Sequence, residues 1–108
     1  LGNLQHEEFW ILYLNQSNRL LAKKCLSKGG ITQTVVDVIL AIKNALEIGA
    51  TGMILAHNHP SGNQNTSRQD KEITQKFIEA ANTFDIIILD HLIVSEKRYF
   101  SFKDENLV

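Results

Sequence analysis

The sequence of 108 residues contains one cysteine, one proline and no long apolar segment. Cys25 has no second cysteine with which to form an internal disulfide, which is typical of proteins in a reducing cytoplasm. No apolar run approaches the roughly 18 residues that a membrane-spanning helix needs, and no signal peptide is recognisable. We therefore expect a cytoplasmic protein without membrane contact.

An excess of either charge is also missing. Eleven Lys and Arg residues stand against twelve Asp and Glu residues, so the net charge is −1. This balance gives no global attraction to nucleic acid or to an anionic membrane. Lys23, Lys24 and Lys28 form a modest basic cluster, which is typical of a solvated strand face. The lone cysteine also excludes the zinc-dependent base deaminases, whose motif needs Pro-Cys-x-x-Cys.

The composition is that of one small folded domain. Hydrophobic residues make up 44% of the chain and charged residues 21%. These fractions supply enough apolar surface for a core and argue against disorder. The first residue is Leu1 rather than Met, so we expect a fragment of a longer chain.

The spacing of apolar residues predicts a mixed sheet of five or six strands flanked by two main helices, an α+β (α/β) fold. We expect strands at 9–14, 19–25, 52–56, 86–89, 91–94 and 98–102, a helix that Thr34 caps and Gly49 ends, and a second helix that Ser67 opens. The polar tetrad 15–18 predicts a hairpin turn between the first two strands.

The one proline belongs to the segment His57-Asn58-His59-Pro60, directly after the apolar strand at 52–56. Residues two apart in a strand point to the same face, so His57 and His59 are expected to project together. Asp70, at the start of the next helix, can complete a set of three ligands. Two imidazoles and a carboxylate with a fourth position open to water are typical of catalytic zinc, and other divalent ions also accept such ligands.

Asp70 and Ser67 have a second interpretation. Ser67-x-x-Asp70 is close to a capping box, in which the serine caps the helix and the acid lies in its first turn. The helix dipole stabilises an acid at that position whatever its function. Beside two histidines, we interpret Asp70 as a metal ligand.

The spaced motif His-x-His-Pro, six residues, Ser, two residues and Asp resembles the signature of the JAMM (MPN+) metalloprotease-like domains. The fuller pattern of residues 56–63 with Ser67, Asp70 and Thr74 resembles the RadC branch of that superfamily. The later run 89–94 and Tyr99-Phe100-Ser101 resemble the same family, so that the resemblance covers nearly the whole chain. The resemblance implies a RadC-like JAB domain over 1–108 with the JAB1/MPN, cytidine-deaminase-like architecture. It also implies a zinc hydrolase that cleaves amide or isopeptide bonds in a protein or peptide substrate.

The resemblance also implies roles for two further residues. In this family, a glutamate at the start of the first strand takes a proton from water, and the matching serine holds the oxygen of the tetrahedral intermediate. Aligned on Phe9, the glutamate is Glu7, and Glu8 is one residue out of register, which would turn it to the other face of the sheet. Ser67 matches the serine, although a purely capping role for it stays open. Two solvated acids before a strand are the alternative interpretation of Glu7 and Glu8.

Other functions and roles remain open on the sequence. The RadC name carries a role as a DNA repair or recombination accessory, and a metal-binding partner scaffold without catalysis is a further alternative. His91, in an apolar run, is interpreted as a buried hydrogen-bonded histidine in preference to a group beside the site. Two departures from the family pattern, Thr66 for proline and Val36-Asp37-Val38 for Pro-Arg-Glu, leave the predicted ligands intact but weaken the carry-over of a basic contact at the cleft.

Overall fold

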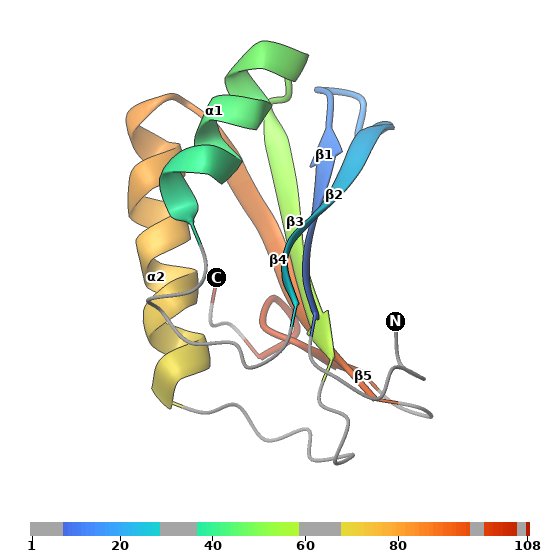
Figure 1. Cartoon of the computed structure of the whole chain (residues 1–108), viewed down its shortest axis with the longest axis vertical. Coiled ribbons are helices and arrows are strands. Elements are labelled where there is room, and N and C mark those ends of the chain that lie inside the picture. The colour runs from blue at the N-terminus through green and yellow to red at the C-terminus, as the bar shows by residue number, and fades with distance from the viewer. Residues whose placement is uncertain (1–7, 29–36, 59–67, 96–98, 106–107) are drawn as a thin grey trace.

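The structure is a computed structural model that describes residues 8–28, 37–58, 68–95, 99–105 and 108 (Figure 1). The strands form one five-stranded sheet with the order β2-β1-β3-β4-β5, in which β3 and β4 are parallel and the other pairs antiparallel. The predicted mixed sheet with two helices is thereby confirmed. The elements are β1 (Glu8–Leu14), β2 (Leu20–Lys28), α1 (Val38–Ile48), β3 (Gly52–Asn58), α2 (Arg68–Thr83), β4 (Ile87–Val94) and β5 (Tyr99–Ser101).

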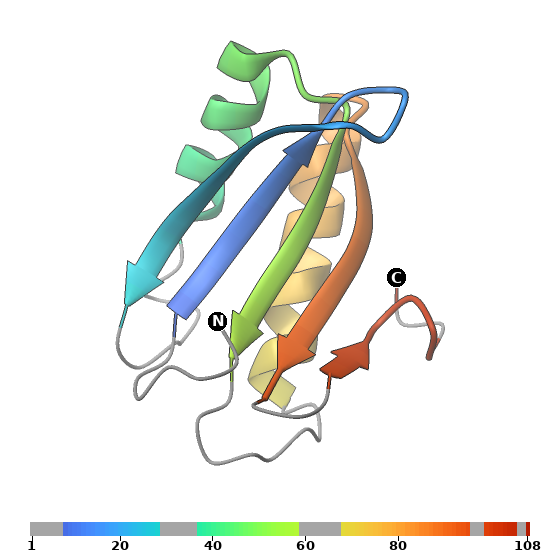
Figure 2. The same cartoon turned by 90° about the vertical axis from the view of Figure 1, so that its right-hand side faces the viewer.

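Both helices cover the same face of the sheet, as Figures 1 and 2 show from two directions. Side chains alternate between the faces of a strand, and Phe9, Ile11 and Tyr13 of β1 are fully buried on the helix side. They pack with Ala41 and Ala45 of α1 and with Phe77 and Ala81 of α2 in one core cluster. Burial of a large apolar side chain contributes about 1.5–3 kcal/mol, so this layer supplies much of the stability.

The β1–β2 hairpin turns at the predicted tetrad. The side-chain oxygen Oδ1 of Asn15 accepts hydrogen bonds from the backbone N–H groups of Ser17 and Arg19 at 2.9 and 3.0 Å. Asn18 takes a left-handed φ of 60° and donates its N–H to the Asn15 carbonyl at 2.9 Å. The hairpin is confirmed, and β2 extends to Lys28 beyond its predicted end at Cys25.

Helix α1 begins later than the sequence predicted. Thr34, the expected cap, lies outside the described residues, and the N-cap of α1 is Asp37, whose Oδ1 accepts from the Leu40 N–H at 3.0 Å. An aspartate accepts this bond at the N-cap at least as well as a threonine, and Asp37 directly precedes the first residue of the helix. Gly49 ends α1 as expected, with a left-handed φ of 81° and its N–H donated to the Ala45 carbonyl at 2.9 Å.

The unit β3–α2–β4 positions the candidate site. Strand β3 continues two residues beyond its predicted end and carries His57, and β4 is one continuous strand through Asp90 and His91. The β3–β4 register shifts between Met53 and Ile54, so that Met53 pairs with Ile88 and Leu55 with His91. The first turn of α2 lies near the end of β3, as Figure 2 shows. In the part of the chain that the structure describes, no helix is long and apolar enough to cross a lipid bilayer.

Candidate metal site

His57 and Asp70 are the predicted ligands that the structure describes. His57 is the next-to-last residue of β3, and Asp70 lies in the first turn of α2. Glu7, His59 and Ser67 lie outside the described residues. Their predicted roles therefore stay predictions.

The structure brings His57 and Asp70 together. The imidazole Nε2 of His57 lies 3.1 Å from Oδ1 of Asp70, and the two side chains are 1% and 10% exposed. Ligand atoms that share one tetrahedral zinc ion lie roughly 3.4 Å apart, given zinc–ligand distances of about 2.0–2.2 Å. An imidazole nitrogen and a carboxylate oxygen at this separation are a donor pair that fits a shared divalent cation.

Aromatic rings enclose the imidazole of His57. Phe9, its partner across the β1–β3 ladder, stacks on it with ring centroids 5.7 Å apart and planes 10° apart. Phe9 also stacks on Phe77 of α2 at 5.9 Å and meets the ring of His91 edge-on at 5.7 Å. The apolar surroundings exclude water from one side of the ring and strengthen its polar contacts.

His91 lies directly behind His57. Its Nε2 is 2.8 Å from Nδ1 of His57, and its Nδ1 is 2.5 Å from the hydroxyl oxygen Oγ1 of Thr74. The interpretation of His91 as a buried, hydrogen-bonded histidine is confirmed, since it is 0% exposed. Its partner is the candidate ligand His57. His91 therefore also lies beside the site, which was the less favoured interpretation of the sequence.

Thr74 belongs to the motif that carries the family resemblance, but no functional role was predicted for it from the sequence. It is 2% exposed, and its hydroxyl donates to the backbone carbonyl of Asp70 at 2.7 Å. The available signal was its position four residues after Asp70, because residues four apart share one face of a helix. Thr74 therefore lies on the face of α2 that Asp70 presents to the site.

Asp90 and the chain after β5 hold His91 from its other side. Oδ1 of Asp90 accepts from the backbone N–H groups of His91 and Lys103 at 2.7 and 3.0 Å, and Oδ2 accepts from the Ser101 hydroxyl at 2.7 Å. Phe102 stacks on His91 with centroids 4.5 Å apart and donates its N–H to the His91 carbonyl at 3.0 Å. The carboxylate of Asp90 thus ties β4 to the segment that covers His91.

Glu8 lies on the other face of the sheet from His57. Its Oε1 accepts from the indole Nε1 of Trp10 at 2.8 Å, and Trp10 is the next side chain on the same face of β1. The Glu8 backbone N–H donates to Oδ1 of Asn58 at 2.6 Å. Since Phe9 faces His57, the neighbouring Glu8 faces away from it. The assignment of Glu7 as the base remains a prediction.

Among the described residues, no three His, Cys, Asp or Glu side chains gather as a metal site. Two predicted ligands are in place, and the third, His59, belongs to the range that the structure does not describe. The ligand set of three thus stays a prediction that one described pair supports.

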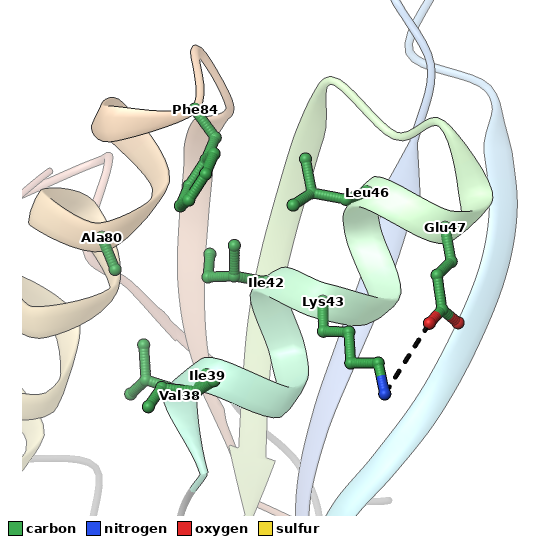
Figure 3. Close-up of a pocket in the computed structure, with 8 residues that line it drawn as sticks. All are labelled: Val38, Ile39, Ile42, Lys43, Leu46, Glu47, Ala80 and Phe84. Atoms are coloured by element: carbon green, nitrogen blue, oxygen red, sulfur yellow. Dashed lines mark ion pairs between the residues drawn. The ribbon is translucent and has the colours of Figure 1, made fainter.

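A separate apolar hollow of about 390 Å³ lies between the two helices (Figure 3). Ile42 and Leu46 of α1 face Ala80 and Phe84 across it, and the Lys43–Glu47 ion pair, 3.9 Å long, lies on the side of α1 away from α2. Ala80 follows Asp70 by ten residues, roughly 15 Å along a helix. The two charged residues that line this hollow, Lys43 and Glu47, pair with each other, and the other lining residues are apolar. Its lining is Val38, Ile39, Ile42, Lys43, Leu46, Glu47, Ala80 and Phe84.

Comparison with protein families matches residues 1–107 to the RadC-like JAB domain. A protein named UPF0758 from Flavobacterium johnsoniae is 56% identical over 107 residues, which cover 99% of this chain and 47% of that relative. UPF0758 protein YfjY of Escherichia coli K12 is 44% identical over 108 residues, which cover all of this chain and 68% of the relative. A UPF0758 protein of Porphyromonas gingivalis is 43% identical over 109 residues, 48% of its length. The chain spans about half the length of the Flavobacterium and Porphyromonas relatives.

Proposed function

Because the chain belongs to the RadC-like JAB domain family, we propose that it is a zinc-dependent hydrolase that cleaves an amide or isopeptide bond in a protein or peptide. The observation that carries this proposal is the buried pair of His57 Nε2 and Asp70 Oδ1, 3.1 Å apart at the end of β3 and the start of α2. Both groups come from the motif that the sequence singled out. A carboxylate and an imidazole brought together in an aromatic enclosure have the chemistry and the spacing of two ligands of one ion.

In this proposal, His57, His59 and Asp70 would hold the cation. A bound divalent ion would polarise the scissile carbonyl and make a nearby water molecule more acidic. Glu7 accepts the proton of that water as its oxygen attacks the carbonyl carbon. The same carboxyl group then returns the proton to the leaving nitrogen, so that a carboxylic acid and an amine are released. Ser67 donates its hydroxyl hydrogen to the carbonyl oxygen, where negative charge develops during the attack.

The first test is the metal content of protein purified without chelator. We expect about one zinc per chain in the wild type and none in His59→Ala or Asp70→Ala, since each change removes one of three protein ligands. Glu79→Ala is the matched control, because Glu79 is an exposed acid of the same helix α2. Wild-type protein that takes up no zinc, even when zinc is added, contradicts the proposal.

The second test is catalysis by the zinc-loaded protein on peptide and isopeptide substrates. Glu7→Gln is expected to keep the metal and to lose turnover by a factor on the order of 10²–10⁴, the usual contribution of a general base. A zinc-loaded protein without hydrolytic activity would favour the partner scaffold. Binding to duplex DNA that weakens steeply with salt, without hydrolysis, would favour the DNA-repair accessory role.

A further inference from the structure

We propose that His91 and Thr74 are positioning residues that hold His57 in the tautomer whose Nε2 presents a lone pair to the cation shared with Asp70. This inference rests on the proposed metal function. It assigns a role to two residues outside the predicted ligand set. The contacts form a ring that starts at the Asp70 side chain, runs through His57, His91 and Thr74, and closes on the Asp70 backbone carbonyl.

The backbone carbonyl of Asp70 determines which atom donates and which accepts in each of these contacts. A carbonyl oxygen can only accept, so the 2.7 Å contact commits the one hydroxyl hydrogen of Thr74 to Asp70. Such a bond to the carbonyl four residues earlier is the usual one for a threonine within a helix. The Thr74 oxygen must then accept in its 2.5 Å contact with His91, so Nδ1 of His91 carries a hydrogen.

The tautomer of His91 in turn determines which nitrogen of His57 carries a hydrogen. His91 is 0% exposed between aromatic rings, Phe9 at its edge and Phe102 stacked on its face, a place that favours the uncharged imidazole. A neutral imidazole with hydrogen on Nδ1 has its lone pair on Nε2. Nε2 of His91 therefore accepts from Nδ1–H of His57 across 2.8 Å. A neutral His57 with hydrogen on Nδ1 has its lone pair on Nε2.

The consequence appears at the contact between His57 and Asp70. In this tautomer, Nε2 of His57 and Oδ1 of Asp70 are both acceptors, and they face each other at 3.1 Å while nearly excluded from water. Two such acceptors repel unless a cation or an added proton lies between them. One turn of α2 therefore contributes both the carboxylate that contacts His57 and the hydroxyl that selects the His57 tautomer.

The first experiment reads the tautomer in metal-free wild type, so it depends neither on zinc binding nor on a variant that must fold. In protein with ¹⁵N-labelled histidine at neutral pH, we expect Nδ1 of His57 to have the chemical shift of a protonated ring nitrogen, because this hydrogen is donated to Nε2 of His91. An Nδ1 of His57 that carries no hydrogen overturns the proposal, whether or not the protein binds zinc. If Nδ1 of His57 carries its hydrogen in a protein that does not bind zinc, the metal function fails while the positioning by His91 and Thr74 stands.

The second experiment measures zinc affinity in three variants of α2. Thr74→Val keeps the side-chain volume but removes the hydroxyl, and we expect zinc to bind about 10–100-fold more weakly, the usual effect of losing an outer partner of a ligand. Thr74→Ser restores the hydroxyl and should bind within a few-fold of the wild type. Thr83→Val is the matched control, since the exposed Thr83 also bonds to the carbonyl four residues earlier, that of Glu79. Equal affinity in Thr74→Val and wild type overturns the proposal.

Discussion

Phe9 is the side chain that joins the sheet to both described histidines. It stacks on His57, meets the edge of His91 and stacks on Phe77, while being 0% exposed. Its position opposite His57 in the β1–β3 ladder makes this contact a consequence of strand register. The ring therefore fixes the plane of the His57 imidazole, in addition to contributing to the hydrophobic core.

Tyr13, four residues further along β1 and on the same face, connects the sheet to α1. It is fully buried, and its hydroxyl donates to the Ala41 carbonyl at 3.0 Å. Burial raises the pKa of Tyr13 above its ordinary value, and a hydrogen bond with the Asn44 side chain opposes the shift. The folded protein therefore binds the phenol hydrogen more tightly than the unfolded chain does.

This raised pKa predicts a dependence of stability on alkaline pH. Tyr13 stabilises the fold fully below its unfolded pKa of about 10, and the contribution is lost as pH rises through the folded pKa. Tyr13→Phe should cost about 1 kcal/mol of unfolding free energy at neutral pH, through the lost hydrogen bond. In urea unfolding from pH 7 to 11, we expect the gap between wild type and Tyr13→Phe to narrow above about pH 10. A gap that widens there contradicts the assigned direction.

At the level of elements, α1 depends on its two caps. No acidic residue lies in its first turn and no basic residue in its last turn, so its ends depend on the capping residues themselves. Asp37 satisfies the Leu40 N–H at the start, and Gly49 accepts the left-handed conformation at the end. The helix must hold its ends well because Ala41 and Ala45 are fully buried against the sheet.

Gly49→Ala tests the end of α1. A Cβ at this position meets no heavy atom within 4 Å, so any cost comes from the φ of 81° alone. We expect a loss of about 1 kcal/mol in unfolding free energy, measured by chemical denaturation. Gly49→Asn is the control, because asparagine adopts the left-handed conformation more readily and should cost less. Equal costs for the two variants would exclude backbone conformation as the cause.

The contacts of His57 with Asp70 and with His91 differ in how far the sequence predicts them. The pairing of His57 with Asp70 could be predicted, because the spaced motif places one at a strand end and the other in the next helix. The contact between His57 and His91 could not, because it depends on the register shift of β4 at Leu89. A continuous register would turn His91 to the opposite face of the sheet, and no local signal in the apolar run marks such a shift. The N-cap of α1 was expected at Thr34 and is Asp37, because two residues that can both cap a helix lie close together in the sequence.

For the whole molecule, the candidate site links three separate parts of the chain. His57 belongs to β3, Asp70 and Thr74 to α2, and His91 to β4. The geometry of the site therefore exists only when the sheet and α2 are both folded. A cation that needs this geometry binds the folded protein much more tightly than the unfolded chain.

Thermal unfolding should consequently depend on zinc. At a free zinc concentration 100-fold above Kd, the native state gains about 2.7 kcal/mol. For a domain of this size, each kcal/mol corresponds to roughly 4–8 °C, so we expect Tm to rise by about 10–20 °C in calorimetry. Asp70→Ala should show no such rise, and magnesium should have little effect because it requires six oxygen ligands. A rise of the same size in Asp70→Ala would place the zinc elsewhere.

Trp10, which is hydrogen-bonded to Glu8, gives the protein a single intrinsic fluorophore of its kind near the candidate site. The chain contains one tryptophan, and its indole Nε1 donates to Glu8 at 2.8 Å. Glu8 in turn is bonded through its backbone to Asn58, the residue that follows His57. All tryptophan fluorescence of this domain therefore originates beside the strand end that carries the candidate ligand, on the opposite face of the sheet. Its emission reports on that end of β3 without any attached dye, and no second indole contributes a background from the rest of the fold.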